Sequence, residues 1–288
     1  MGATVVPHWT DLDWRPATHD VEIDGRRIRY ADHGDGPALV LLHGMGGCWQ
    51  WWLEVLPELA LHHRVIAVDL PGFGRSEPLP RPADIATHAD IVAALVRRLG
   101  IDRVIVAGHS MGGLVSISLA IEHPELVDRL VLVDAGGVPM SERRLGAVLK
   151  LLRASYWTFT RPAVLNRLTT SSTTRNRMLK MAFRQPDSLS PELAREVIPA
   201  LAAPGFLDSI AASARAVRTT EPERISQPTL LIWGAHDAFA PLHTAHAMLD
   251  RLPDGRLRVL TDVGHSPLVE APSRFLEAML PFTSGEPT

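Results

Sequence analysis

Five short apolar segments, each bounded by Gly, Pro or Asp, set the strongest limit on the fold of this chain. They are ALVLL (38–42), RVIAVDL (64–70), RVIVAG (103–108), RLVLVDA (129–135) and PTLLIWG (228–234). Apolar runs of this length are typical of strands covered on both faces, as in a parallel sheet. Segments with helical apolar spacing lie between or after them, at 48–61, 84–99, 111–123 and 241–251. This alternation predicts a doubly wound α/β fold.

The segments on either side extend this pattern. HDVEIDG and RRIRYADHG alternate polar and apolar residues around Asp24-Gly25, which predicts an antiparallel hairpin at the edge of the sheet. Downstream, residues 255–262 predict a last strand and residues 272–282 a closing helix. We therefore expect a mostly parallel sheet of about eight strands.

One long region interrupts the alternation. Residues 137–222 contain helical patterns such as RRLGAVLKLLRASYWTF and no convincing strand, and the strand-helix order resumes at QPTLLIWG. We interpret this region as a helical cap inserted into a core domain. The predicted division is residues 1–136 for the first part of the core, 137–222 for the cap and 223–288 for the second part.

Composition narrows the classes of function. With 46% hydrophobic and 21% charged residues the chain is expected to be globular. A net charge of −3 with no prominent basic run argues against nucleic acid as a partner. No stretch approaches 18 consecutive apolar residues and no basic-then-apolar leader is visible, so we expect no membrane span and a cytoplasmic location. The single cysteine, Cys48, is expected to be a packed small side chain.

The motif GHSMGG (108–113) makes Ser110 a candidate nucleophile. It follows an expected strand and opens an expected helix, the setting of a serine held on a sharp strand-to-helix turn. Such a turn needs almost no side chain two positions away on either side, and Gly108 and Gly112 meet that need. The first N–H groups of the helix would then face a group attached to Ser110.

A serine hydroxyl needs a base, and the base needs an acid to orient it. His265 in DVGHSPLVEAP and Asp237 in WGAHDAFAP both follow expected strands, at the edge of a parallel sheet where ligands bind. Asp134 after RLVLVDA is an alternative acid. His243 and His246 share a helix face but have no third ligand at metal spacing, so no metal and no cofactor are expected.

Together these motifs resemble those of α/β-hydrolase fold enzymes that carry a helical cap. The resemblance rests on LLHGMGG (41–47), DLPGFGRSE (69–77), GHSMGG, WGAHDAFAP and GHSPLVEAP, and it extends over residues 20–283. It implies the triad Ser110, Asp237 and His265, with Asp237 preferred to Asp134 because its motif matches the family. The backbone N–H groups of Met45 and Met111 are implied as the oxyanion hole. Residues expected to line a substrate pocket are Gly44, Trp49, Trp157 and Phe239.

The resemblance implies a serine hydrolase that acts on a small molecule, foremost a carboxylic ester with an apolar acyl or aromatic portion. Carbon–carbon hydrolases of aromatic ring-fission products share the motifs, but usually place a tryptophan after the catalytic histidine, where this chain has Ser266. A perhydrolase, an acyltransferase or a non-catalytic receptor would keep the same fold. Epoxide hydrolases and haloalkane dehalogenases are disfavoured because they need aspartate at position 110. Cap helices can form either a lid or a homo-oligomer interface.

Overall fold

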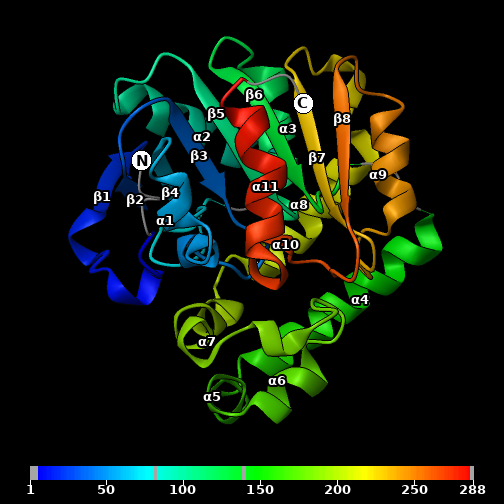
Figure 1. The fold of residues 1–288 in the computed structure, drawn as a ribbon. Coiled ribbons are helices and arrows are strands. Elements are labelled where there is room, and N and C mark those ends of the chain that lie inside the picture. Colours follow the sequence, from blue (N-terminus) through cyan, green and yellow to red (C-terminus); the bar gives the residue numbers. More distant parts are fainter. Residues whose placement is uncertain (1–5, 81–82, 138–140, 286–288) are drawn as a thin grey trace.

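A computed structural model describes residues 6–80, 83–137 and 141–285, and these form one mixed eight-stranded sheet between two layers of helices (Figure 1). The strand order is β1-β2-β4-β3-β5-β6-β7-β8. The strands are β1 (Thr18–Ile23), β2 (Arg26–His33), β3 (Ala38–Leu42), β4 (Arg64–Val68), β5 (Val104–His109), β6 (Val127–Val133), β7 (Thr229–Gly234) and β8 (Gly255–Leu260).

The direction of the strands agrees with the sequence pattern. β1 and β2 form the predicted antiparallel hairpin, and β2 also runs antiparallel to β4, whereas the pairs from β4 to β8 are all parallel. Asp24 and Gly25 of the hairpin turn both have positive φ, of 49° and 71°, as such a tight turn requires. The predicted sheet of about eight strands, mostly parallel, is confirmed.

Helices cover both faces of the sheet. The α-helices are α1 (Leu56–Leu59), α2 (Ile85–Arg98), α3 (Met111–Glu122), α4 (Glu142–Phe159), α5 (Pro162–Thr170), α6 (Ser172–Met178), α7 (Pro191–Val197), α8 (Phe206–Thr219), α9 (Leu242–Leu249), α10 (Pro267–Glu270) and α11 (Pro272–Thr283). Short 3-10 turns are η1 (Trp9–Asp11), η2 (Arg15–Ala17), η3 (Trp49–Trp52), η4 (Pro186–Ser188), η5 (Ile198–Ala202) and η6 (Pro222–Arg224).

The core consists of two apolar clusters, one on each face of the sheet. One joins alternate strand residues such as Val40 and Val106 to α2, α3, α8 and α9. The other joins the intervening residues, such as Leu41 and Ala107, to α1, α10 and α11. Burial on both faces explains why the central strands are continuous apolar runs.

The segment 48–61 differs from its predicted helix. It folds as η3 followed by the one-turn α1, with a break at residues 53–55. Pro57 accounts for the break, because its ring has no N–H to donate and clashes with a helical carbonyl one turn earlier.

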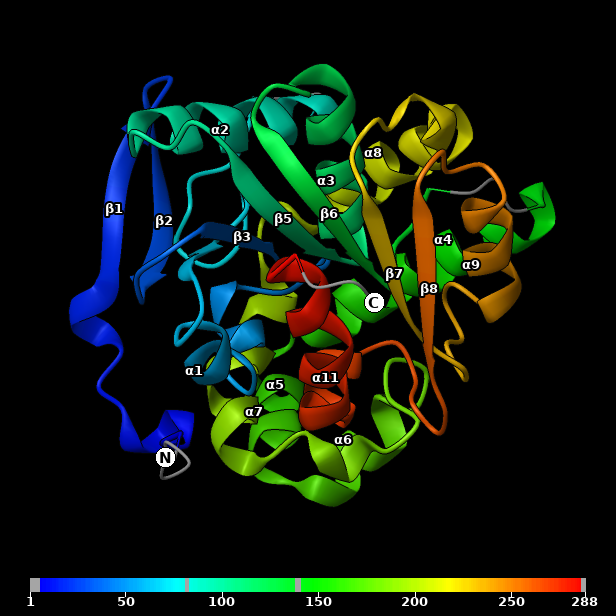
Figure 2. The same cartoon turned by 45° about the horizontal axis from the view of Figure 1, so that its top comes forward.

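The helical insertion leaves the sheet after β6 and returns at β7. Figures 1 and 2 both show α5, α6 and α7 gathered beyond one edge of the sheet, at the bottom of each view. The last helix, α8, contacts α2, α3 and α4, so it covers the sheet as well as the cap. The predicted cap comprises residues 137–222, of which residues 138–140 lie outside the described residues. That the cap is a separate domain stays a prediction.

The sequence suggested no membrane span. In the part of the chain that the structure describes, no single helix has the length and apolarity to cross a bilayer. The bent pair Pro191–Ala202 and Phe206–Thr219, with an angle of 81°, meets the criterion by length and composition alone.

Candidate active site

Ser110 lies on a sharp turn between β5 and α3. Its backbone has φ 54° and ψ −113°, a conformation that costs a non-glycine residue roughly 1–3 kcal/mol. The turn is tight on both sides. A Cβ at Gly108 would collide with the carbonyl oxygen of Gly112 and with Oγ of Ser116, and a Cβ at Gly112 would collide with the carbonyl oxygen of Leu42. The two glycines are therefore required by close backbone approach.

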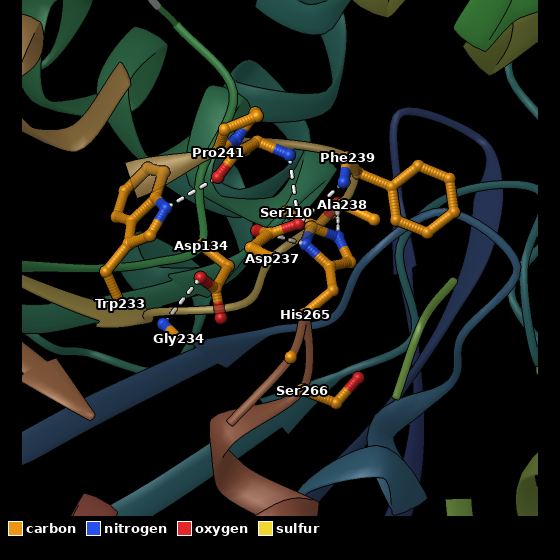
Figure 3. Close-up of polar contacts among 12 residues, drawn as sticks. Ser110, Asp134, Trp233, Gly234, Asp237, Ala238, Phe239, Pro241, His265 and Ser266 are labelled. Carbon is orange, nitrogen blue, oxygen red and sulfur yellow. Dashed lines mark hydrogen bonds and ion pairs between the residues drawn. The ribbon is translucent and has the colours of Figure 1, made fainter. Parts of the chain in front are cut away.

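The structure brings Ser110, His265 and Asp237 together in one hydrogen-bonded chain (Figure 3). The Ser110 Oγ lies 2.9 Å from Nε2 of His265, and the Nδ1 of this ring lies 2.7 Å from Oδ2 of Asp237. A carboxylate can only accept, so Nδ1 carries the proton and Nε2 is free to accept one from the serine. The order nucleophile, base and acid is the one that activates a serine hydroxyl.

Asp237 is held by its own loop. Its Oδ1 accepts hydrogen bonds from the backbone N–H groups of Phe239 and Ala240, at 2.7 and 2.9 Å. Burial pushes the pKa of Asp237 upward, but the charge of His265 and these hydrogen bonds hold it below its ordinary value. The acid therefore stays ionised while it orients His265.

A second buried carboxyl, Asp134, lies close to both Asp237 and His265, but the hydrogen bond to Nδ1 of His265 is made by Asp237. It follows β6 with a φ of 44°, and its Oδ1 accepts from the N–H of Gly234 at 3.0 Å. Burial and then the charge of Asp237 raise the pKa of Asp134 well above its ordinary value. The Oδ2 of Asp134 is buried and has no hydrogen-bond partner within the described residues. The raised pKa favours the neutral carboxyl, so Asp134 lies beside Asp237 without adding a second negative charge there.

The backbone near Ser110 presents two free N–H groups. Neither the N–H of Met45 nor that of Met111 donates a hydrogen bond within the described residues. Met111 is the first residue of α3, where N–H groups have no partner in the helix. A Cβ at Gly44 would lie 3.1 Å from the Cβ of Ser110, so the loop that carries Met45 passes directly beside the serine. Both N–H groups are therefore free to bind an oxyanion beside Ser110, and their role as oxyanion donors stays a prediction.

His43 and His109 hold the backbone of the site. His43 donates from Nδ1 to the carbonyl of Gly44 at 2.7 Å and accepts from the N–H of Leu70 at Nε2. His109 donates from Nε2 to the carbonyl oxygen of His265 at 2.6 Å. Burial lowers their pKa values to about 4 and about 3, so both rings are neutral near pH 7. Both are positioning residues in this arrangement.

Glu270 is a further positioning residue that the sequence analysis did not identify. Its Oε1 accepts from the backbone N–H groups of Gly264 and Ser266, at 2.9 and 3.3 Å. Its Oε2 accepts from those of Arg184 and Gln185 in the insertion, at 2.7 and 2.9 Å. One carboxylate therefore ties both sides of His265 to the cap. The glutamate in GHSPLVEAP was the available signal.

An apolar cavity of about 290 Å³ opens at Ser110. Gly44, Met45, Met111 and Phe239 line it as expected, and the ring of Phe239 lies 5.0 Å from that of His265. Much of the remaining wall is contributed by α4 and α8, through Leu145, Val148, Leu149, Leu152, Phe206, Ile210, Ala214 and Val217. No Lys or Arg occurs among the lining residues that the structure describes.

Two predicted pocket residues lie elsewhere. Trp49 is buried in the core against Trp14, and Trp51 lines the cavity in its place. The two residues belong to the 3-10 turn η3, whose tighter pitch the sequence pattern did not indicate. Trp157 is 64% exposed on the outer face of α4. Helix α4 turns other residues, such as Leu149 and Leu152, toward the cavity.

The described residues hold one cluster with the composition of a metal site, and it is the cluster already described. Ligand atoms of Asp134, Asp237 and His265 all lie within 4.8 Å of one another. Both ring nitrogens of His265 are engaged with Ser110 and Asp237, so the cluster is arranged for internal hydrogen bonding. His243 and His246, both exposed on α9, do not belong to it.

Comparisons with known proteins identify the fold family of this chain. A family model described as alpha/beta hydrolase fold matches residues 37–272. The chain is 32% identical over 270 residues to 2-hydroxymuconate semialdehyde hydrolase of Pseudomonas sp. strain CF600, covering 87% of this chain and 88% of that protein.

Two solved structures show the same likeness. A membrane phospholipase A described as a bacterial virulence factor is 30% identical, with a TM-score of 0.74 and coverage of 93% of this chain and 86% of that one. A thermophilic esterase from Thermogutta terrifontis, with malate bound, is 27% identical, with a TM-score of 0.71 and coverage of 93% and 98%.

Proposed function

The chain belongs to the alpha/beta hydrolase fold family, and from that premise we propose that it hydrolyses uncharged carboxylic esters with an apolar acyl portion. The observation that carries the proposal is the cavity at Ser110, whose wall is almost entirely apolar and has no Lys or Arg among the described residues. An apolar acyl chain gains free energy by leaving water for such a wall, at roughly 25 cal/mol per Å² buried. A charged acyl group would be buried there without a partner.

The proposed reaction proceeds through an acyl-enzyme. The Nε2 of His265 takes the hydroxyl proton as Oγ of Ser110 attacks the ester carbonyl carbon, and the carbonyl oxygen becomes an oxyanion held by the N–H groups of Met45 and Met111. His265 returns the proton to the leaving alkoxide as the carbon–oxygen bond breaks. Water, deprotonated by His265, then attacks the acyl carbon, and Ser110 leaves with the proton as the acid is released. Asp237 stabilises the cationic ring in both steps.

Two relatives support ester hydrolysis as the leading activity. The names of the Thermogutta esterase and the membrane phospholipase A describe enzymes that cleave carboxylic esters, and both cover 93% of this chain. The phospholipase likeness is in keeping with an acyl chain as the apolar group.

Hydrolysis of a carbon–carbon bond is the second candidate, favoured by the likeness to 2-hydroxymuconate semialdehyde hydrolase. It would use the same serine, base and oxyanion donors. A ring-fission acid carries a carboxylate, however, and the described cavity wall has no cation to pair with it.

The test compares wild type with Ser110→Ala and with Ser273→Ala, an exposed serine on α11. We expect the wild type and Ser273→Ala to react with a fluorophosphonate and to hydrolyse p-nitrophenyl esters. Ser110→Ala is expected to lose labelling and roughly 10⁴-fold or more in kcat/KM. Faster turnover of a ring-fission acid than of any neutral ester would replace the proposal by the second candidate. Absence of labelling and of turnover would favour a receptor.

A further inference from the structure

The segment from α4 to residue 184 carries a charge opposite to that of the rest of the molecule. Residues 142–184, called the cationic cap segment below, contain ten Lys or Arg and a single acidic residue, Glu142, a formal charge of +9. The whole chain carries −3, so the remainder carries −12. Eight of the ten cations are exposed: Arg143, Lys150, Arg153, Arg161, Arg167, Arg177, Lys180 and Arg184.

These cations are not neutralised within the described part of the chain. No ion pair joins any of the ten to a carboxylate in residues 6–80, 83–137 or 141–285. Glu142, the one acid of the segment, is paired with Arg218 outside it. The segment therefore presents its positive charge to whatever lies next to it.

The same segment exposes large apolar side chains. Four of the seven large hydrophobic residues that are exposed in the described chain belong to it: Leu151, Trp157, Met178 and Met181 are 38%, 64%, 37% and 41% exposed. Leu151, Met178 and Met181 also line the cavity at Ser110, so they mark its mouth. Exposed apolar side chains at the mouth of a cavity are typical of an interaction surface, and Trp157, which is not among the cavity-lining residues, adds a further exposed ring on α4.

Exposed cations and exposed apolar residues are direct neighbours in the sequence of this segment. Each of the three mouth residues is preceded directly by an exposed cation, in the pairs Lys150-Leu151, Arg177-Met178 and Lys180-Met181. On α4, Arg143, Lys150 and Trp157 are spaced by seven residues, which places them on one exposed face of the helix. Apolar side chains with cations beside them are typical of helices that lie in a membrane interface.

We propose that the cationic cap segment docks on an anionic lipid surface, with the mouth of the cavity against the lipid. The cations would pair with headgroup phosphates while Leu151, Trp157, Met178 and Met181 enter the acyl boundary. A symmetric contact between two copies would oppose two +9 surfaces and is disfavoured by like-charge repulsion. The proposal extends the proposed function, since such a surface would supply acyl esters directly to Ser110.

The test uses full-length protein carrying Ser110→Ala, so that binding is measured without turnover. Flotation with vesicles of pure phosphatidylcholine is compared with flotation with an equal-part mixture of phosphatidylcholine and phosphatidylglycerol. We expect binding to the anionic vesicles only, weakened by salt. Lys150→Glu/Lys180→Glu should lower the partition coefficient by well over tenfold, given roughly fivefold for each cation removed.

Two controls separate docking from general charge and from folding. Arg98→Glu/Arg258→Glu changes two exposed cations outside the segment and should bind as the parent does. Lys150 and Lys180 do not line the cavity. In a protein that keeps Ser110, Lys150→Glu/Lys180→Glu should therefore leave hydrolysis of a short soluble ester unchanged. Trp157→Ser tests the apolar part and should weaken binding several-fold.

Several outcomes would overturn the proposal. They are absence of binding to anionic vesicles, equal loss in the Arg98→Glu/Arg258→Glu control, or binding to heparin but not to vesicles, which would indicate a soluble polyanion. A change of oligomeric state in Lys150→Glu/Lys180→Glu would indicate a second copy instead. Binding is measured with Ser110→Ala and hydrolysis with the wild type. If the variant docks on the vesicles but the wild type hydrolyses no ester, the proposed function is refuted and the lipid inference stands.

Discussion

The triad region and the cationic cap segment hold their side chains in opposite ways. Around Ser110 the side chains of Ser110, His265 and Asp237 are joined by short hydrogen bonds, and His109 and Glu270 hold the backbone at His265 from two sides. In the cap segment the exposed cations have no carboxylate partner among the described residues. The difference teaches that a rigid hydrogen-bonded frame suits the proposed reaction, while side chains without partners suit the proposed contact with a lipid surface.

Among substitutions in the triad region, Asp237→Asn is expected to cause the largest loss of kcat. The amide no longer enforces the proton on Nδ1 of His265, so the ring loses both its tautomer and the charge that stabilises its cation. We expect kcat to fall by roughly 10⁴-fold with KM little changed. Stopped-flow hydrolysis of a p-nitrophenyl ester measures the rate, and thermal unfolding checks the fold. A loss of less than tenfold would show that Asp134 can replace Asp237.

Glu270→Ala tests whether the link between the His265 loop and the cap matters for the rate. Four backbone N–H groups lose their acceptor, so we expect kcat to fall roughly 10- to 100-fold and the free energy of unfolding by about 1–3 kcal/mol. Glu270→Gln keeps one oxygen as an acceptor, so its kcat and its free energy of unfolding should lie between those of the wild type and Glu270→Ala. Glu277→Ala, an exposed acid on α11, is the control. Loss of stability with kcat intact would reduce Glu270 to a structural role.

In the cationic cap segment, Leu149→Trp should change the selectivity for acyl-chain length and leave the chemical steps at Ser110 unchanged. Leu149 lines the cavity, and a larger ring there shortens the space for an acyl chain. We expect kcat/KM to fall about tenfold for long-chain esters and to stay unchanged for acetate esters. Ala154→Trp adds the same ring on the exposed side of α4. An equal fall for every chain length would place the acyl group elsewhere.

Asp134→Asn is expected to have the smallest effect on rate. The amide has the shape of the neutral carboxyl and can accept from the N–H of Gly234 as that carboxyl does, so kcat at neutral pH should change by no more than about twofold. A larger loss with an unchanged fold would show that the carboxyl is ionised.

The pH dependence of stability is the sharper measurement for Asp134. Its pKa is raised in the folded state, so its contribution to stability is complete below the unfolded value and is lost as pH rises through the folded value. The asparagine variant cannot ionise. Its free energy of unfolding, relative to wild type, should therefore rise as the pH is raised above the ordinary aspartate pKa of about 4. Asp254→Asn, at an exposed acid, should show no such trend. Urea unfolding measures both.

The fold and the three central site residues could be predicted because each has a local signature. At the turn that carries Ser110, a side chain at position 108 or 112 would collide with the backbone, so both must be glycine, and Asp237 and His265 follow strand ends within short motifs. Trp49 and Trp157 were wrongly placed in the pocket because the orientation of a side chain on η3 or α4 depends on how that element packs. The charge of the cap segment escaped notice because its cations are spread over 42 positions and form no run.

The sequence by itself determined the order of strands and helices, the strained turn at Ser110 and the chain order of serine, acid and base, because these depend on local backbone chemistry. Only the tertiary structure decided which groups meet. It placed Asp134 beside Asp237, joined Glu270 to residues 184 and 185 across 86 and 85 positions, and brought Leu151, Met178 and Met181 together at one cavity. Such meetings depend on packing between distant segments, which no local pattern encodes.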